Sequence, residues 1–164
     1  MNVIGFITGI SIGVGGILLY KMRTPKLKTK GTADEVVQYF LSKGFSLNQA
    51  VGIAGNIKAE SNFNSLASGD SGSAFGIAQW RKDRLQNLKR FSKDNNINYK
   101  DFNSQLAFIA YELQHHEKLA LTKLKQSNTL ESATINFAKY YERPQASLIP
   151  KRVNYSNLIM KNYI

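Results

Sequence analysis

The pattern of apolar and polar residues separates an uncharged N-terminal run from a longer part with helical periodicity. Residues Val3–Tyr20 contain no charged side chain over 18 consecutive positions. After Thr32, apolar residues recur at spacings of three and four, which places them on one face of an α-helix. Phe102, Leu106 and Ile109 are an example. We therefore expect an apolar N-terminal segment followed by a mostly α-helical domain.

Capping patterns and turn residues give the expected boundaries of the helices. Thr32 with Glu35 and Ser46 with Gln49 are spaced as capping boxes, which satisfy free N–H groups at the start of a helix. Gly44 is placed to end the first helix. Helices are expected over Val36–Lys43, Ser46–Ser61, Arg81–Phe91, Phe102–His116, Lys118–Gln126, Leu130–Tyr141 and Lys151–Asn162.

One segment, Asn62–Gln79, interrupts the helical pattern. It is rich in Gly, Ser, Asn and Asp, which are typical of turns. Its short apolar piece, Ala74–Ala78, indicates a small strand or hairpin. The sequence thus predicts a mostly α domain with a short β-hairpin or irregular insertion between helices.

The run Val3–Tyr20 is long enough to be a transmembrane helix. At about 1.5 Å per residue, a helix of this length spans roughly 27 Å, close to the hydrocarbon thickness of a bilayer. A cleaved signal peptide is the alternative, but no basic residue precedes the run and no small-x-small cleavage site follows it. Gly5, Gly9 and Gly13 share one helix face, which lets a second helix approach closely in lipid. We expect a membrane anchor (residues 1–20), a basic linker (21–31) and a helical domain (32–164).

Composition and charge narrow the class of protein. The chain has 164 residues, a net charge of +11 and no cysteine, which excludes disulfides, thiolate metal sites and cysteine nucleophiles. Five of the 22 basic residues lie in residues 1–30, so the other 134 residues still hold 17 basic against 11 acidic side chains. A basic domain favours an anionic partner, whether nucleic acid, anionic lipid or a bacterial wall polymer.

Two carboxyl groups, those of Glu60 and Asp70, are the candidates for acid–base chemistry. Glu60 lies near the C-terminal end of an apolar helix, where the helix dipole disfavours an anion and neighbours such as Ile57 and Phe63 would desolvate it. Asp70 lies in a loop rich in Gly and Ser, where hydration would keep it ionised. Two carboxyls in different environments are the minimum for cleaving a glycosidic bond. An exposed helix end for Glu60 and a turn cap for Asp70 are the alternatives.

Four segments in order carry a resemblance to a known family. They are Ala59–Phe63 (AESNF), Gly69–Trp80 (GDSGSAFGIAQW), Gln105–Leu113 (QLAFIAYEL) and Tyr141–Pro144 (YERP). Together they strongly resemble the phage tail-lysozyme family, within the wider lysozyme and lytic-transglycosylase superfamily. The resemblance covers roughly residues 34–155. It implies a lysozyme-like fold and an enzyme that cleaves the MurNAc–GlcNAc backbone of peptidoglycan.

The resemblance also implies roles for individual residues. Glu60 matches the acid that protonates the glycosidic oxygen, and Asp70 matches a second carboxylate of some members. Gln79 matches a glutamine that lines the cleft, with Ser73 nearby. The further residues expected to bind substrate are Trp80, Tyr111, Tyr141 and Glu142. Core packing is the alternative for the aromatic rings, and a structural ion pair with an arginine is the alternative for Glu142. No cofactor or metal is implied, since the acid and the polar groups of the substrate suffice.

Two other functions remain open from the sequence. Lytic transglycosylases of this superfamily use one carboxyl and the substrate's own C6 hydroxyl, giving anhydro-MurNAc ends, whereas hydrolases need a second group to handle water. A non-catalytic structural or nucleic-acid-binding membrane protein of a virus particle would also explain the basic charge. It would not explain the four ordered segments, so nucleic acid is not expected as a partner.

The basic linker bears on the location of the protein. The positive-inside rule would place Lys21–Lys30, and the domain after it, on the cytoplasmic side of a plasma membrane. A wall-cleaving enzyme has no substrate there, and an internal membrane of a virus particle removes the conflict. We therefore expect a single-pass protein of a virion membrane that acts on the periplasmic wall of the host.

Overall fold

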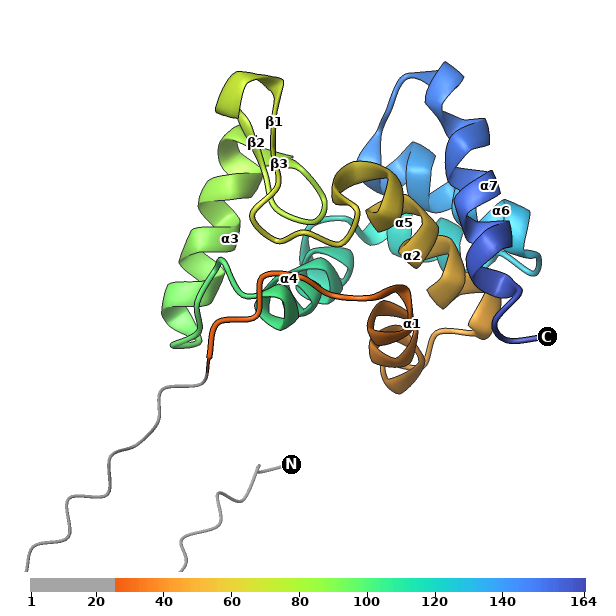
Figure 1. Cartoon of the computed structure of the whole chain (residues 1–164), viewed down its shortest axis with the longest axis horizontal. Helices are drawn as coiled ribbons and strands as arrows, with labels where there is room; N and C mark the ends of the chain where they lie inside the picture. The colour runs from red at the N-terminus through yellow and green to blue at the C-terminus, as the bar shows by residue number, and fades with distance from the viewer. Residues whose placement is uncertain (1–25) are drawn as a thin grey trace, which may run out of the picture.

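In the computed structural model, which describes residues 26–164, helices build most of the domain and a small sheet lies at one side (Figure 1). The α-helices are α1 (Ala33–Ser42), α2 (Leu47–Ser61), α3 (Lys82–Asp94), α4 (Phe102–His115), α5 (Lys118–Lys125), α6 (Leu130–Phe137) and α7 (Ile149–Met160). A π-helical turn, η2 (Ala138–Glu142), continues α6, and two short 3₁₀ turns are η1 (Asp70–Gly72) and η3 (Ala146–Leu148). The predicted fold class, mostly α with a small β element, is confirmed.

The predicted membrane anchor, Val3–Tyr20 with its glycine face at Gly5, Gly9 and Gly13, lies outside the described residues. Between residues 26 and 164, no helix combines the length and the apolar composition needed to cross a bilayer.

The end of the predicted linker is part of the domain. The carbonyl of Lys28 accepts a hydrogen bond from the N–H of Phe102 at 2.7 Å, and the N–H of Gly31 donates to the carbonyl of Phe63 at 3.0 Å. Lys30 forms an antiparallel bridge with Asn64. The backbone contacts of the domain therefore begin at Lys28 rather than at Thr32.

The predicted capping boxes begin α1 and α2. The side-chain oxygen of Thr32 accepts from the N–H of Glu35 at 3.2 Å, and that of Ser46 accepts from the N–H of Gln49 at 3.3 Å. Asn62 then ends α2 in the left-handed conformation, with φ of 49°. Because α2 stops at Ser61, Glu60 lies in its last turn.

The interruption between α2 and α3 forms a three-stranded antiparallel sheet. Its strands are β1 (Ser68–Gly69), β2 (Ala74–Phe75) and β3 (Trp80–Arg81), in the order β1-β2-β3, with Phe75 opposite Trp80. The expected strand within Ala74–Ala78 corresponds to β2. Strand β3 was not predicted, because a strand of two residues has no alternation of apolar and polar positions to detect.

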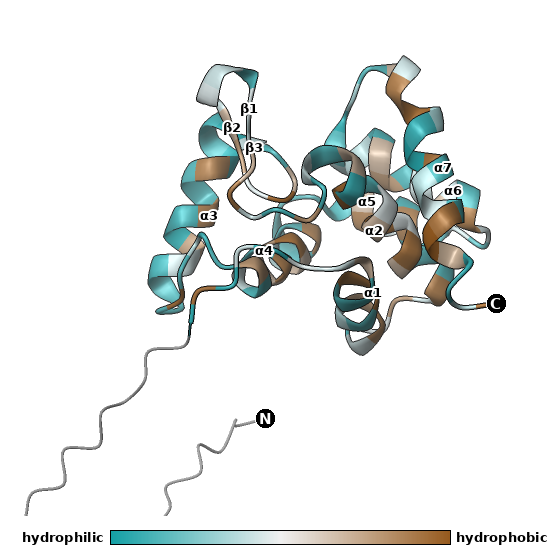
Figure 2. Ribbon diagram, viewed as in Figure 1, coloured by the Kyte–Doolittle hydropathy of each residue, from teal (hydrophilic) through white to brown (hydrophobic). Residues whose placement is uncertain are grey.

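The central helix is α2, which contacts α1, α6 and α7. All of its residues from Gln49 to Ile57 are buried. By contrast α3 buries little beyond Leu88 and Ser92, and Figure 2 shows it as mostly hydrophilic with a few hydrophobic bands. A Cβ added to Gly55 would lie 2.9 Å from the backbone nitrogen of Ser156 in α7. This glycine therefore lets α7 pack directly against α2.

A buried carboxylate, that of Glu112 in α4, connects three other elements. Its Oε2 accepts hydrogen bonds from Trp80 Nε1 at 2.7 Å and from the hydroxyl of Tyr141 at 2.6 Å. The guanidinium of Arg84 donates from Nε to Oε1 and from Nη2 to Oε2, both at 2.9 Å. Trp80 belongs to β3, Arg84 to α3 and Tyr141 to η2. One side chain thus holds the sheet, α3 and the π-helical turn together.

We expect Gly55→Ala to destabilise the domain, because the added methyl group would meet backbone atoms of α7. Overpacking costs about 1–3 kcal/mol, while alanine gains up to about 1 kcal/mol over glycine in a helix, so the net loss is about 1–2 kcal/mol. Denaturant titration measures the free energy of unfolding. Gln38→Ala, at an exposed position of α1, is the control and should change it by less than about 0.5 kcal/mol. Equal stability of Gly55→Ala and wild type would contradict this account of the α2–α7 contact.

We expect Glu112→Ala to destabilise the domain by about 3 kcal/mol, since it leaves a guanidinium and two buried donors without their acceptor. The lower end of the usual range applies because a quarter of the Arg84 side chain, 26%, remains exposed. Trp80→Phe removes one hydrogen bond and should cost about 1–2 kcal/mol. Tyr111→Phe, a variant of the same helix outside the network, is the control. Thermal and denaturant unfolding of the four proteins tests the ranking, which an undisturbed Glu112→Ala would overturn.

Candidate active site

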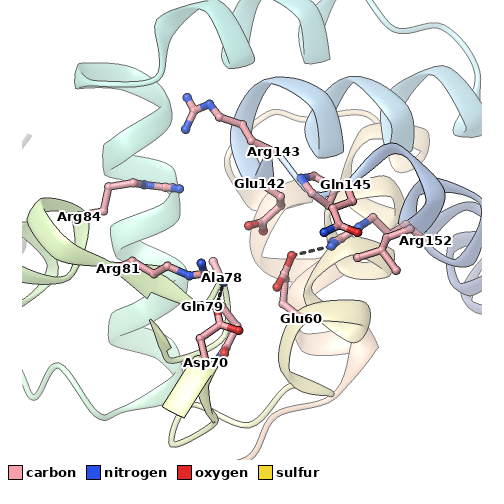
Figure 3. A pocket seen from close by; sticks show the side chains of 12 residues that line it. Glu60, Asp70, Ala78, Gln79, Arg81, Arg84, Glu142, Arg143, Gln145 and Arg152 are labelled. Atoms are coloured by element: carbon pink, nitrogen blue, oxygen red, sulfur yellow. Dashed lines mark hydrogen bonds and ion pairs between the residues drawn. The ribbon is translucent and has the colours of Figure 1, made fainter. Parts of the chain in front are cut away.

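A cleft of about 530 Å³ lies between the last turn of α2, the sheet, η2 and α7 (Figure 3). Its twelve residues come from segments far apart in the sequence, and seven of them are charged. The lining residues are Glu60, Asp70, Ala78, Gln79, Arg81, Arg84, Glu142, Arg143, Pro144, Gln145, Leu148 and Arg152. Of the eight candidate site residues, the cleft brings together Glu60, Asp70, Gln79 and Glu142.

Glu60 enters the cleft from the end of α2 and is paired with an arginine. Arg152 of α7 donates from Nη2 to Glu60 Oε1 at 2.7 Å and from Nη1 to Asn56 Oδ1 at 3.3 Å. Arg152 itself is buried, whereas the side chain of Glu60 remains 18% exposed. The prediction that apolar side chains surround the carboxyl of Glu60 is therefore corrected. Ile57 and Phe63 are buried in the core, and the partner of the carboxyl is a guanidinium.

Asp70 reaches the cleft from the loop at the tip of the sheet. Its carboxylate forms an ion pair with Arg81, in which about half of each side chain is exposed. Asp70 and Ser71 both adopt positive φ, 48° and 55°, so the loop turns sharply at this point. Ser73 stays outside the cleft lining, and its hydroxyl donates to the Asp70 carbonyl at 2.9 Å. The expected hydrated setting of Asp70 agrees with this exposure, and Ser73 supports the turn that carries it.

Gln79 is held rigidly in the wall of the cleft. Its Nε2 donates to the carbonyls of Ala67 at 3.2 Å and Gly76 at 2.9 Å. A Cβ on Gly69 would collide with the Gln79 amide oxygen, so glycine at this position leaves room for the amide. Gln79 itself has φ of 48°. These contacts fix the amide across the cleft from Glu60.

Glu142 ends the π-helical turn, and one of its oxygens is enclosed by protein. Although the residue as a whole is partly exposed, its Oε1 is buried and has no hydrogen-bond partner among the atoms of the described domain. Burial raises the pKa of the Glu142 carboxyl well above its usual range, and the negative charge of Glu60 adds to this shift, against the opposing effect of Arg84 and Arg152. The alternative role for Glu142 was a structural ion pair with an arginine. Among residues 26–164, its carboxyl forms no ion pair, so this alternative is not supported.

The three aromatic candidates do not line the cleft. Trp80 and Tyr141 are 1% and 0% exposed, so neither ring offers a face to a sugar. Their polar atoms bind Glu112 instead, which makes them supports of the cleft wall. Tyr111 lines a separate hollow beside Phe91, and its ring stacks on His115 at 4.2 Å between centroids. The prediction that substrate sugars stack on these rings is therefore not supported. In the structure, the three rings pack against other side chains of the protein.

Three further residues of the site were absent from the sequence-based prediction: Arg152, Arg84 and Glu112. Arg152 is 92 positions from its partner Glu60, and no local pattern relates the two. Glu112 did leave a trace in the sequence. It follows Phe108 by four positions and Ile109 by three, so it falls on the apolar face of its helix, where a carboxylate requires buried donors.

The arrangement can donate a proton to a bound substrate and can orient water. Carboxyls that differ in burial and in charged neighbours are suited to separate acid and base roles. Within residues 26–164, no group of three or more His, Cys, Asp or Glu side chains is arranged to hold a metal ion.

Comparison with known proteins shows the family of this chain. The sequence model of a family described as phage tail lysozyme matches residues 31–163, which include every residue of the cleft. Morphogenesis protein 1 of Bacillus phage B103 is similar to this chain, at 25% identity over an alignment of 132 residues that covers 73% of this chain and 36% of that protein. Since the family match covers most of the sequence, the chain belongs to the phage tail lysozyme family.

Proposed function

We propose that this protein cleaves the glycan backbone of peptidoglycan between MurNAc and GlcNAc, with Glu60 as the acid. The observation that carries the proposal is the position of Glu60 in a cleft that Asp70 and Gln79 line from the sheet side. Membership of the phage tail lysozyme family supports the same substrate class. Glu60 protonates the glycosidic oxygen, so the leaving sugar departs as a neutral alcohol.

Gln79 and Glu142 contact the bound glycan directly in this proposal. The Gln79 amide is fixed by two backbone carbonyls, and a rigid amide binds a sugar hydroxyl with little loss of side-chain entropy. Trp80 and Tyr141 act behind these two residues, since each is the sequence neighbour of one of them. Ser73 holds the Asp70 loop, and Tyr111 has no part in the chemistry.

Hydrolysis is the reaction we favour over lytic transglycosylation. Asp70 is half exposed and lies across the cleft from Glu60 (Figure 3), where a carboxylate can orient an attacking water. A transglycosylase needs no group at this place, because the C6 hydroxyl of the substrate attacks instead. Arg81 forms an ion pair with the carboxylate of Asp70.

We also propose that residues 1–20 anchor the protein in an internal membrane of a phage particle, and that residues 21–27 connect the anchor to the domain. The uncharged run Val3–Tyr20 and the basic residues after it support an anchor. A wall-cleaving domain held there would cut locally, at the site of entry.

The variants Glu60→Gln and Asp70→Asn should differ in their effect on cleavage of purified peptidoglycan. Losing the general acid should lower the rate by at least about 10²-fold, whereas losing a carboxylate that only orients water should lower it less. Glu131→Gln and Asp83→Asn, at exposed positions outside the cleft, are the matched controls. Turbidity loss and release of reducing ends give the rates. Full activity of Glu60→Gln would refute the assignment of the acid.

Mass spectrometry of the fragment ends separates the two reactions. We expect reducing MurNAc ends, because a second, exposed carboxylate in the cleft, that of Asp70, supports a water-orienting role. Anhydro-MurNAc ends, lighter by one water, would establish a lytic transglycosylase and leave Asp70 with a structural role. Absence of both from folded protein would favour a non-catalytic role in the particle.

The location is tested by fractionation. The protein should be found in purified virions and released from them by detergent, together with lipid. Recovery from the plasma membrane of uninfected cells would contradict a virion location, and release by high salt alone would contradict an anchor.

A further inference from the structure

The enclosed oxygen of Glu142 indicates whether this carboxyl carries a proton. Glu142 Oε1 is buried and makes no hydrogen bond within the described domain. A carboxylate anion with a buried oxygen and no donor is unfavourable, because the charge loses water and gains nothing in return. A neutral carboxylic acid fits this position better. The geometry of the turn thus favours a protonated Glu142.

Glu60 has the opposite environment. Its Oε1 receives a charge-assisted hydrogen bond of 2.7 Å from Arg152, whose side chain is only 5% exposed. A buried guanidinium at this distance favours the carboxylate form of its partner. The carboxyl assigned to catalysis is therefore occupied by a buried guanidinium, while the enclosed carboxyl of Glu142 lines the same cleft. Figure 3 shows both carboxyl groups directed into the same cavity.

We propose that Glu60 and Glu142 act as a carboxyl pair that holds one proton, and that Glu142 supplies Glu60 with the proton delivered to the glycosidic oxygen. This inference rests on the proposed function and adds a residue that acts through Glu60. Glu142 is a proton-holding partner rather than the group that touches the scissile bond.

The transfer balances in protons and electrons. The O–H bond of Glu142 breaks as a Glu60 oxygen takes the proton, which leaves Glu142 as the carboxylate. The O–H bond of Glu60 then breaks as the glycosidic oxygen takes that proton, together with the electron pair of the cleaved C1–O bond. The attacking water adds its oxygen to C1 and returns one proton to the pair. If the C6 hydroxyl attacks instead, its proton restores the pair in the same way.

The charged groups around Glu142 suit this exchange. They come from the elements that face it: Glu60 of α2, Arg84 of α3, Glu112 of α4 and Arg152 of α7. The hydroxyl of Tyr141 in η2 is uncharged. The two arginines favour the negative charge that remains on Glu142 after transfer, against the opposing charges of Glu60 and Glu112. The next residue, Arg143, pairs with Glu117 instead. The cleft therefore accommodates one negative charge on either carboxyl of the pair.

The sign of the pH dependence follows from burial. Because burial raises the pKa of Glu142, the pair keeps its proton up to higher pH than an ordinary glutamate would. Activity should therefore persist toward neutral pH and fall as the pH rises through the raised pKa. Without Glu142, the proton delivered through Glu60 has to come from solvent, so activity should lose the part of its pH range that the raised pKa of Glu142 supports.

The decisive comparison is between wild type, Glu142→Gln and Glu142→Asp over pH 5 to 9, using the full chain and purified peptidoglycan. Glu142→Gln keeps the shape of the side chain and cannot release a proton. We expect its kcat to fall by about 10²-fold at neutral and higher pH and far less at pH 5. Any change in KM that comes from the contact of Glu142 with the glycan should be the same at every pH. Glu142→Asp, which restores an acid, should recover part of the rate at neutral pH. An equal loss at every pH, or a loss in KM alone, would show a structural or binding role and overturn the inference.

A second readout does not depend on activity. A raised native pKa means that folded protein binds the Glu142 proton more tightly than unfolded protein does, so this stability is lost as the pH rises through the raised pKa. The unfolding midpoint of wild type should therefore fall relative to that of Glu142→Gln as the pH increases. Parallel midpoints would place no proton on Glu142. If wild type cleaves no peptidoglycan at any pH, the proposed function fails, while the midpoints still decide the protonation of Glu142.

Discussion

The cleft depends on one carboxylate that no substrate reaches, that of Glu112. Its oxygens accept hydrogen bonds from Trp80 in the sheet, Arg84 in α3 and Tyr141 in the π-helical turn. Trp80 follows Gln79 directly, and Tyr141 directly precedes Glu142. The two rings that Glu112 holds are therefore the sequence neighbours of two residues on opposite walls. Tyr141 also stacks on Phe137 at 4.5 Å. The contacts of Glu112 in the core therefore hold the two walls of the cleft at a fixed distance. The rings of Trp80 and Tyr141 contribute to the site by supporting these walls from beneath.

Within residues 26–164, the site contains buried polar atoms without hydrogen-bond partners, and these lower the stability of the fold. Arg152 is buried, and its Nε has no hydrogen-bond partner within the described residues, as is also true of Glu142 Oε1. Such groups lower the stability of a fold, because their lost hydration is only partly replaced. They persist where rigid surroundings leave them no alternative. Here the surroundings are α2, buried from Gln49 to Ile57, and α7, which Gly55 lets approach it. Stability in the helical core thus offsets the cost of the charges in the cleft.

The features that could be predicted from the sequence are those that depend on interactions between residues close together in the chain. The starts of α1 and α2 are specified by residues three apart, such as Thr32 and Glu35, and both predicted capping boxes are present, although α1 begins three residues before the expected Val36. Strand β3 is too short for a pattern, and the π-helical turn after Phe137 was read as the end of a continuous helix. Arg152 escaped because only the folded chain brings it to Glu60. For Trp80 and Tyr141, hydropathy cannot separate a ring that binds sugar from one that fills a core. Glu112 on the apolar face of its helix was the clue that buried donors must lie nearby.

The three carboxyls of the cleft differ in water access, and this orders their proposed roles. Glu142 is enclosed at one oxygen, Glu60 is 18% exposed and Asp70 is 51% exposed. A proton is retained best where an anion would lose most hydration, so it belongs on the Glu142 side. A water molecule needs room and polar partners, which the exposed pair of Asp70 and Arg81 provides. Glu60 lies between these extremes in exposure and lines the same cleft as the other two carboxyls. In the proposed mechanism, this gradient of burial separates proton delivery, on the side of Glu142, from water attack, on the side of Asp70.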